Sequence, residues 1–493
     1  MPGKIKGWSK SLPVVLLVIL LAVVILRLPS LFEPRYYGDE DIYLTVGMGI
    51  RKGLVLYKDV FDNKPPLIYL MGALAGSFFW FRVILLLWNL LSVTLFYDLA
   101  ILVMRDKTKA EVSTMVFAVM STIPLFEGQI VNSEVLFILT TITGWLLVWR
   151  ELKLEKTNMA RWLAAGTSMG VGVLFKMPAL VDVLGLVFVA VILAPKILVG
   201  IKRAVWLSIG ATVPLALSIL GFVFTGAVAI YLKSAFWELF PYLSSWGNKG
   251  ASQGSGLGLR AVLLSISCMI LLIARKKFST ALIAVSAWMI FAIFGALLSG
   301  RPYPHYLMQV VPPLSFIFVW LLMGDKREGI FATVHTLIFA GIFCAFRFWY
   351  YPTYSYYEAF IRFAVGRTSR DEYSAVFEKK ALWYRPLVEF IKATTSSKDR
   401  IFVWGTDPAI YVFSKRLPAS RYTVAYHVHE KGAEKEVMGE LEKNKPRLIV
   451  LVKGEGEFDE LSQYISREFL LVGEFGEAQV FRRMESLRGM GAL

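Results

Sequence analysis

Residues 12–41 read LPVVLLVILLAVVILRLPSLFEPRYYGDED, an apolar run followed almost at once by the acidic cluster Asp39-Glu40-Asp41. A helix needs about 20 mainly apolar residues to cross the hydrocarbon core of a bilayer. Carboxylates beside such a run are either solvated loop residues or part of an active site, because polar groups at membrane depth are costly and often functional. A second polar motif, Lys64-Pro65-Pro66-Leu67, follows before the next long apolar run. This stretch predicts a membrane protein with candidate chemistry just after its first span.

The composition excludes an ordinary soluble protein. Of 493 residues, 56% are hydrophobic, which suits many membrane spans and one further domain. The formal net charge of +16 falls largely in short Lys and Arg clusters between apolar runs, as topology determinants do, so nucleic acid is not an expected partner. Cys268 and Cys344 both lie in apolar runs, so neither a disulfide nor a metal pair is predicted.

The predicted fold class is a mainly α polytopic membrane protein with about eleven transmembrane helices. Lys4, Lys6 and Lys10 precede the first run and no small-residue cleavage site follows it, so we interpret it as an uncleaved span. The segment 66–79 is apolar but short, and we interpret it as an interfacial helix. The predicted spans are 11–28, 81–104, 111–127, 134–149, 161–175, 178–195, 204–224, 259–274, 279–298, 305–323 and 329–348.

The basic residues predict an orientation for these spans. The basic clusters lie in alternate connections between the spans and therefore fall on one face of the membrane. The positive-inside rule identifies this face as cytoplasmic. The N-terminus is then cytoplasmic, and an odd number of spans places everything after residue 348 on the extracytoplasmic side, with the loops 29–66 and 225–258. The clusters are Lys4/Lys6/Lys10, Arg105/Lys107/Lys109, Arg150/Lys153/Lys156/Arg161, Lys196/Lys202/Arg203, Arg275/Lys276/Lys277 and Lys326/Arg327.

Residues 349–493 predict a separate extracytoplasmic α/β domain after a transmembrane domain that covers residues 1–348. The region begins with aromatic residues suited to a membrane interface and then becomes charged. Alternating strand and helix patterns indicate a small α/β fold. The predicted strands are 401–404, 447–452 and 469–472, and the predicted helices are 382–394, 430–444 and 457–467.

Two candidate functional groups lie in the first outer loop of this topology. Asp39, with Glu40 beside it, is a candidate general base because a carboxylate fixed above the bilayer can accept the proton of an attacking hydroxyl; the alternative is a solvated loop carboxylate. Lys64 precedes two prolines that keep its segment extended, so its ammonium is directed and suits a phosphate partner. The alternative for Lys64 is ordinary snorkelling at the interface.

Further polar groups fall on the same predicted face. Lys176 occupies a tight turn and should face inward, where a structural ion pair with Asp182 is the alternative interpretation. The segment Arg301–Tyr306 combines Arg301 and His305 with two tyrosines, which supplies donors for phosphate oxygens. An aromatic belt would explain the tyrosines alone.

The remaining polar residues have simpler interpretations. Asn132 and Ser133 precede Glu134 and are interpreted as a helix cap. His427 and His429 are expected on one face of a strand in the terminal domain. His335 and these two histidines lack Cys or carboxylate partners at ligand spacing, so no metal site is predicted.

These motifs, in this order and on one face, resemble the GT-C glycosyltransferases of the protein O-mannosyltransferase and aminoarabinose (lipid A) transferase type. The resemblance covers approximately residues 10–325 and rests on the Asp39-Glu40 pair, Lys64-Pro65-Pro66-Leu67, Lys176-Met177-Pro178 and His305-Tyr306. It implies an inverting glycosyltransferase that moves a sugar from a polyprenyl-phosphate donor to an acceptor on the outer face.

The resemblance also implies roles for individual residues. Asp39 and Glu40 would be the catalytic carboxylates, and Tyr37 and Glu134 would line the cavity on the acceptor side. The implied donor phosphate-binding residues are Lys64, Lys176, Arg301, His305 and Tyr306.

Several features stay open at this level. The sugar would be a hexose or an aminosugar, with mannose among the candidates, and the acceptor a lipid, a glycan or a protein. The loop 225–258 holds no inserted domain of the kind seen in protein mannosyltransferases, and its Gly247, Gly250, Gly254, Gly256 and Gly258 suggest mobility over substrate. No cofactor is predicted, and a requirement for a divalent cation is open. The alternative function is a flippase or transporter of polyprenyl-linked sugar, which predicts polar residues spread through the bilayer rather than gathered at one face.

Overall fold

The computed structural model describes residues 13–34, 37–239, 255–348, 352–378 and 380–484. Each of the eleven apolar runs contains a helix. These helices are α1 (Val14–Arg27), α4 (Phe78–Met104), α5 (Lys107–Met120), α6 (Ser133–Val148), α7 (Met159–Phe175), α8 (Ala179–Ile192), α9 (Ile197–Phe224), α12 (Ser255–Ala274), α13 (Thr280–Ala296), α14 (Val311–Met323) and α15 (Lys326–Phe346). Short 3-10 turns also occur, namely η1 (Leu28–Leu31), η2 (Pro124–Phe126), η3 (Trp149–Glu151) and η5 (Pro304–Val310).

Length and apolarity support a chain that crosses the membrane several times. Within the described residues, 7 helices are long and apolar enough to span a bilayer, some of them counted together with an adjoining 3-10 turn. The helices α8 and α13 are apolar but shorter. The mainly helical, polytopic fold class is confirmed, whereas the count of eleven spans stays a prediction.

The chain forms two compact units. The first unit contains Met1–Leu28, Leu85–Ala216 and Pro241–Thr353, and the second contains Pro29–Ile84, Leu217–Phe240 and Tyr354–Leu493. A domain limit at residue 349 stays a prediction, and the second unit also includes Pro29–Ile84.

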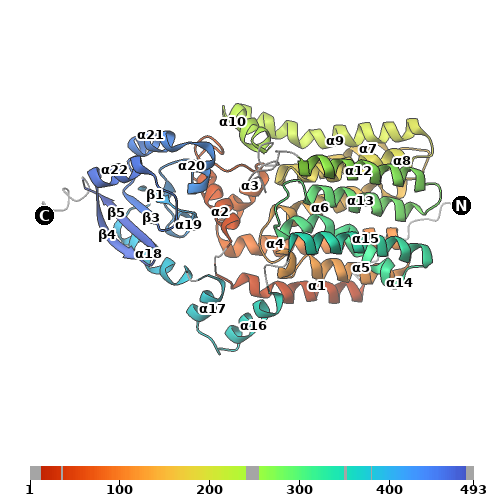
Figure 1. The fold of residues 1–493 in the computed structure, drawn as a ribbon, viewed down its shortest axis with the longest axis horizontal. Helices are drawn as coiled ribbons and strands as arrows, with labels where there is room; N and C mark the ends of the chain where they lie inside the picture. The colour runs from red at the N-terminus through yellow and green to blue at the C-terminus, as the bar shows by residue number, and fades with distance from the viewer. Residues whose placement is uncertain (1–12, 35–36, 240–254, 349–351, 379, 485–493) are drawn as a thin grey trace. The chain divides into compact units, whose positions relative to one another are not determined.

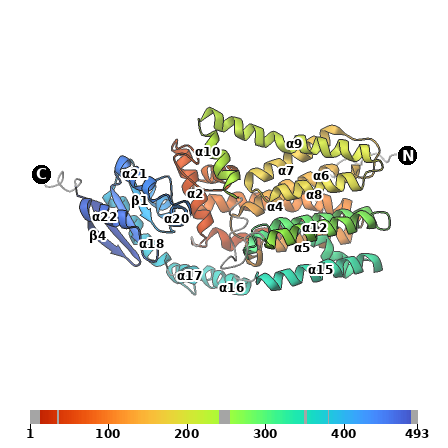
Figure 2. The same ribbon diagram turned by 45° about the horizontal axis from the view of Figure 1, so that its top comes forward.

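The first unit is a bundle of long helices that lie side by side in both views (Figures 1 and 2). Small residues bring some of the helix backbones very close. A Cβ atom added at Gly170 of α7 would lie 2.3 Å from the carbonyl oxygen of Ala211 in α9, and one at Gly210 of α9 would lie 2.1 Å from that of Leu163 in α7. Glycine is therefore needed where these two helices cross, as is common between helices in membranes.

The second unit contains a five-stranded sheet with the order β2-β1-β3-β5-β4. β1 is parallel to β2 and β3, with Phe402 opposite Ile449, whereas β5 is antiparallel to β3 and β4, with Val450 opposite Val480. The elements are α16 (Thr353–Ala364), α17 (Arg370–Phe377), α18 (Ala381–Thr394), β1 (Arg400–Trp404), α19 (Ala409–Ser414), β2 (Leu417–Pro418), α20 (Ala425–Lys431), α21 (Glu434–Asn444), β3 (Leu448–Val452), α22 (Asp459–Glu468), β4 (Phe469–Phe475) and β5 (Ala478–Arg483).

Helices cover both faces of this sheet. One apolar cluster joins Ile401 and Val403 to α18 and α19, and the other joins Phe402 and Ile449 to α20, α21 and α22 (Figure 1). The predicted α/β region is therefore confirmed, with alternate residues of buried strands facing opposite helical layers.

The segment 29–66, predicted as an outer loop, is not a simple loop. It contains α2 (Gly38–Arg51), and Phe61 after this helix belongs to the apolar cluster with α20–α22; the segment 66–79, predicted as an interfacial helix, contains α3 (Leu67–Ala75). The backbones of α2 and α3 meet at Gly47 and Gly72, where an added Cβ would lie 2.4 Å from Ala73 N and 2.5 Å from Tyr43 O. Three acidic residues in the first turn of α2 suit the positive end of its helix dipole, which explains a helix that hydropathy alone did not indicate.

Several local predictions need correction. His427 and His429 lie in the helix α20, not on a strand, and the predicted helix 430–444 is interrupted at Gly432, whose φ of 58° ends α20. Part of the loop 225–258 is helical, in α10 (Val228–Leu232) and the π-helix η4 (Lys233–Trp237). Gly256 and Gly258 belong to α12, while Gly247, Gly250 and Gly254 lie outside the described residues.

Candidate functional site

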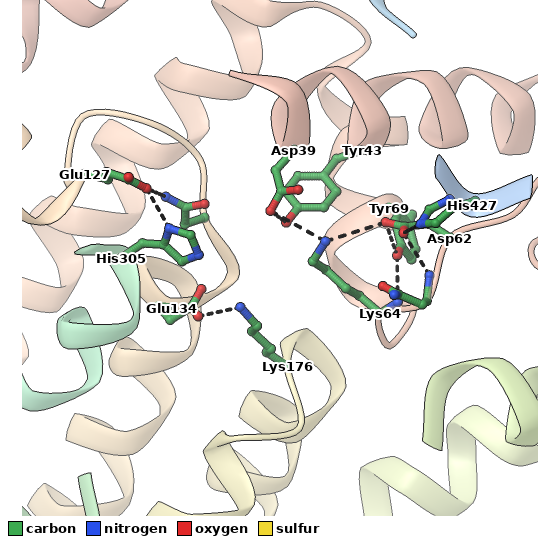
Figure 3. Close-up of polar contacts among 12 residues, drawn as sticks. Asp39, Tyr43, Asp62, Lys64, Tyr69, Glu127, Glu134, Lys176, His305 and His427 are labelled. Atoms are coloured by element: carbon green, nitrogen blue, oxygen red, sulfur yellow. Dashed lines mark hydrogen bonds and ion pairs between the residues drawn. The ribbon is translucent and has the colours of Figure 1, made fainter. Parts of the chain in front are cut away.

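Six residues of the second unit form a polar group that we call the Lys64 cluster: Asp39, Tyr43, Asp62, Lys64, Tyr69 and His427 (Figure 3). The Lys64 Nζ atom lies 3.5 Å from Asp39 Oδ2 and 3.8 Å from Asp62 Oδ2. It also lies 5.0 Å from the centre of the Tyr43 ring, whose hydroxyl donates to Asp39 Oδ2 at 2.9 Å. A single ammonium therefore sits against two carboxylates and one aromatic face.

Two tyrosines fix the main chain of Lys64. The Tyr57 hydroxyl donates to the Lys64 carbonyl at 2.7 Å, and the Lys64 N–H donates to the Tyr69 hydroxyl at 3.0 Å. Burial raises the pKa of both phenols well above the usual value, and nearby Asp62 raises them further, so both stay neutral at physiological pH. Tyr57 adopts a left-handed conformation with φ of 68°, which is uncommon for a bulky residue. The expected directed lysine is thus held from both sides.

Asp39 and Glu40 are neighbours in sequence but have different surroundings. The Asp39 side chain is 28% exposed beside Lys64, whereas Glu40 is 1% exposed and forms an ion pair with Arg82 at 2.8 Å. Arg82 also donates to the carbonyls of Ser30 and Glu33 at 2.9 Å each. Of this pair, Asp39 is accessible enough to meet a substrate, and Glu40 anchors α2 to the segment before it. Tyr37 is the half-buried N-cap residue of the same helix.

Five residues of the first unit form a second group, the Lys176 cluster: Glu127, Glu134, Lys176 and His305, which Figure 3 labels, and Tyr306. Lys176 ends α7, and its Nζ atom lies 2.5 Å from Glu134 Oε1 and 4.4 Å from the centre of the Tyr306 ring. Glu134 is 3% exposed in the first turn of α6. The side chain of Lys176 is 14% exposed, so it faces inward as expected.

The ion-pair partner of Lys176 corrects one interpretation. The sequence allows Asp182 as its partner, but Asp182 instead accepts a hydrogen bond from Thr141 at 3.1 Å, while Glu134 pairs with the lysine. Asn132 occupies the N-cap position of α6 as predicted, but its side chain makes no cap bond and its amide donates to Glu127 instead. Glu134 therefore has a buried ionic role that an N-cap motif did not reveal.

His305 continues this cluster through a residue that the sequence did not single out. Its Nδ1 atom lies 2.6 Å from Glu127 Oε2, and both side chains are at most 5% exposed. Tyr306 packs edge-on against the His305 ring at 4.7 Å, which links the histidine to the aromatic face beside Lys176. Arg301 precedes this turn, and its main-chain N–H donates to the hydroxyl of Ser299. Lys176, His305 and Tyr306 are thus brought together, whereas their role in binding phosphate stays a prediction.

Comparison with solved structures identifies the architecture. The aminoarabinose transferase ArnT from Cupriavidus metallidurans, in its apo state, matches with a TM-score of 0.55 and 15% identity over 96% of this chain and 98% of that one. The same protein bound to undecaprenyl phosphate matches with a TM-score of 0.54 and 14% identity over the same shares. The chain has the GT-C fold. The resemblance expected from the sequence motifs is confirmed at the level of the fold.

Other solved structures add little to this likeness in fold. An oligosaccharyltransferase from Archaeoglobus fulgidus shares 17% identity over 89% of this chain and 68% of its own, with a TM-score of 0.46 that is too low to support an argument. Neither a protein-family model nor a curated protein sequence matches.

The sequence did not indicate several members of the two clusters. Tyr43 lies one helical turn after Asp39, a relation that appears only when α2 is recognised as a helix. Asp62 and Tyr69 lie close to Lys64 in sequence and could have been found from the spacing around the two prolines. His427 comes from a remote segment, so no local signal predicts its place beside Asp62.

Within the described residues, no three His, Cys, Asp or Glu side chains are grouped so that they could hold a metal ion.

Proposed function

We propose that this GT-C chain is an inverting glycosyltransferase that transfers a hexose or aminosugar from a polyprenyl-phosphate donor to an acceptor on the extracytoplasmic face. The observation that carries the proposal is the Asp39 carboxylate beside the clamped Lys64 ammonium. The likeness in fold to a transferase solved with undecaprenyl phosphate supports the choice of lipid donor. The acceptor is a lipid, a glycan or a protein.

Asp39 is proposed as the general base. The acceptor oxygen or nitrogen forms a bond to the anomeric carbon, the bond from that carbon to the phosphate oxygen breaks, and the electron pair leaves with polyprenyl phosphate. The acceptor proton passes to Asp39, which contributes about 10²- to 10⁴-fold to the rate. The hydroxyl of Tyr43, which donates to Asp39 Oδ2, keeps the carboxylate in one orientation.

Lys64 is proposed to bind the phosphate of the donor. Negative charge grows on this group as the bond to the sugar breaks, so a fixed cation stabilises the transition state more than the ground state. The proposal also includes Lys176, Arg301, His305 and Tyr306 as phosphate-binding residues, each on the basis of the family resemblance. Within it, Glu134 orients Lys176 through their ion pair.

Glu40 is proposed to support the base rather than to replace it. The Glu40 carboxylate forms a buried ion pair with Arg82. To accept a proton, this carboxylate would have to lose its interaction with the arginine. Tyr37 begins the same helix and is proposed to contact the acceptor. Mannose remains among the candidate sugars.

The test is a transfer assay with the full chain in lipid nanodiscs and a polyprenyl-phosphate sugar labelled in the sugar. We expect release of polyprenyl phosphate with transfer of the label to an acceptor or to water, and at least about a 100-fold loss in Asp39→Asn. An active Asp39→Asn variant would contradict the role of Asp39.

The second candidate, a transporter of lipid-linked sugar, is tested in proteoliposomes. It predicts that intact lipid-linked sugar appears on the other leaflet with no cleavage of the phosphate bond. Transport without cleavage would overturn the transferase proposal.

A further inference from the structure

Asp62 is a buried carboxylate at the centre of the Lys64 cluster that neither the motif nor the proposed reaction uses. Its side chain is 1% exposed, and charged groups so deep in a protein need several compensating contacts. Asp62 Oδ2 accepts from the Tyr69 hydroxyl at 2.7 Å, and Oδ1 accepts from the Asn63 N–H at 2.8 Å. Lys64 Nζ lies 3.8 Å from Oδ2, which places the ammonium between Asp62 and Asp39 (Figure 3).

The fourth contact of Asp62 comes from the α/β region. His427 in α20 places its Nε2 atom 3.4 Å from Asp62 Oδ1, and both side chains are 1% exposed (Figure 3). The His427 ring is held edge-on against Phe61 at 5.3 Å and Tyr426 at 4.4 Å. The imidazole is therefore fixed with one nitrogen toward the carboxylate.

A neutral His427 is better suited to orient the Asp62 carboxylate than to neutralise its charge. Burial lowers its pKa to about 4, although Asp62 acts in the opposite direction, and the nearby ammonium groups of Lys64 and Lys431 lower it as well. A neutral imidazole can hold a carboxylate in place without cancelling its charge. The negative charge of Asp62 is then left for the Lys64 ammonium.

We propose that Asp62, oriented by His427 and Tyr69, is a positioning residue that holds Lys64 for the donor phosphate, so that the α/β region contributes directly to donor binding. This inference rests on the proposed function, because it assigns Lys64 a phosphate partner. Tyr69 joins both arms of the arrangement, since its hydroxyl donates to Asp62 and accepts from the Lys64 N–H. Because Asp39 and Asp62 lie at comparable distances from the Lys64 ammonium, neither carboxylate draws it into a close ion pair. The ammonium therefore keeps its orientation until the phosphate binds.

The experiment measures binding of undecaprenyl phosphate without sugar, and steady-state transfer, with the full chain in nanodiscs. His427→Phe keeps an aromatic ring and removes the nitrogen that faces Asp62, while His427→Gln returns an amide near the same position. Asp62→Asn and Tyr69→Phe test the other members. His429→Phe is the matched control, because His429 lies on the same helix but is 37% exposed and pairs with Glu434.

We expect His427→Phe and Tyr69→Phe to weaken undecaprenyl phosphate binding about tenfold, because each loses a polar contact with the Asp62 carboxylate, a hydrogen bond for Tyr69 and a 3.4 Å contact for His427. For donor transfer, KM should rise by a similar factor and kcat should fall as well, because the proposed contact of Lys64 with the phosphate strengthens in the transition state. Asp62→Asn should weaken binding at least as much. His427→Gln should recover most of the affinity, and His429→Phe should equal the unmodified chain.

The outcomes separate this inference from the function beneath it. If the unmodified chain neither binds undecaprenyl phosphate nor cleaves the donor, the proposed function fails. If the unmodified chain binds and transfers but folded His427→Phe and Tyr69→Phe have unchanged affinity and KM, the positioning role is overturned. A lowered melting temperature with unchanged affinity per folded molecule would likewise show that the histidine only stabilises the fold.

Discussion

Glu40→Gln separates an anchoring carboxylate from a catalytic one. The change keeps the size of the side chain and one acceptor oxygen, but removes the charge that faces Arg82 at 2.8 Å and 3.4 Å. Hydrogen bonds to a charged group contribute about 1.5–3 kcal/mol, and breaking a buried ion pair costs about 3–5 kcal/mol. Arg82 retains Glu33, whose Oε1 atom lies 3.4 Å from its Nη1, so it is not left uncompensated. We therefore expect a loss of about 2–3 kcal/mol in the free energy of unfolding.

The assay follows denaturant unfolding in detergent micelles by intrinsic tryptophan fluorescence, together with transfer activity below the transition. Arg82→Met is the companion variant, and it should cost more, about 5 kcal/mol, because it removes the cation that faces both buried carboxylates, Glu40 and Glu33. At a temperature where Glu40→Gln is folded, its activity should fall less than about tenfold, against at least about 100-fold for Asp39→Asn. A fully stable Glu40→Gln protein without activity would refute the anchoring role and make Glu40 the base.

Three further outcomes are expected. Lys64→Met should weaken undecaprenyl phosphate binding by about ten- to a hundredfold, whereas Lys58→Met, which alters an exposed lysine of the same segment, should not; equal binding by both would contradict a phosphate role for Lys64. Burial lowers the pKa of His427 to about 4, below its ordinary value of 6.5, so the unfolded chain binds the proton more strongly. The stability that neutral His427 contributes is then present above pH 6.5 and is lost as pH falls toward 4, by up to about 3 kcal/mol. His427→Gln should flatten this part of a curve of unfolding free energy against pH. An unchanged slope in the variant would contradict this role of His427. Gly47→Leu should lower the melting temperature by forcing α2 and α3 apart, and a temperature equal to that of the unmodified chain would show that the two helices do not meet closely at Gly47 and Gly72.

Long-range sequence patterns predicted the architecture well. A membrane span shows itself by length and hydropathy alone, so each of the eleven apolar runs contains a helix. The buried strands 401–404 and 447–452 were equally clear as short apolar runs between helical patterns. β5 was missed because its sequence, AQVFRR, mixes charge with few apolar residues, and it becomes a strand by pairing between β3 and β4.

Local contacts were predicted less well, because they depend on which elements meet. The helix α2 was read as a loop, since its first turn is acidic and Gly47 and Gly49 weaken its helical pattern, although Gly47 is what permits contact with α3. The neighbouring Asn132 and Ser133 indicate a helix start around Glu134, but they do not indicate its ion-pair partner, because Lys176 lies 42 residues away in sequence. His427 could not be assigned to the Lys64 cluster before α20 was placed beside Asp62.

The central claim is that Asp39 accepts the acceptor proton during cleavage of a polyprenyl-phosphate sugar. The most direct measurement is single-turnover cleavage of a polyprenyl-phosphate sugar by the full chain and by Asp39→Asn, at donor concentrations that saturate both. The account predicts unchanged affinity for undecaprenyl phosphate within about threefold and a cleavage rate at least about 100-fold lower in the variant. A variant that binds the lipid and cleaves the donor at the rate of the unmodified chain would contradict the account.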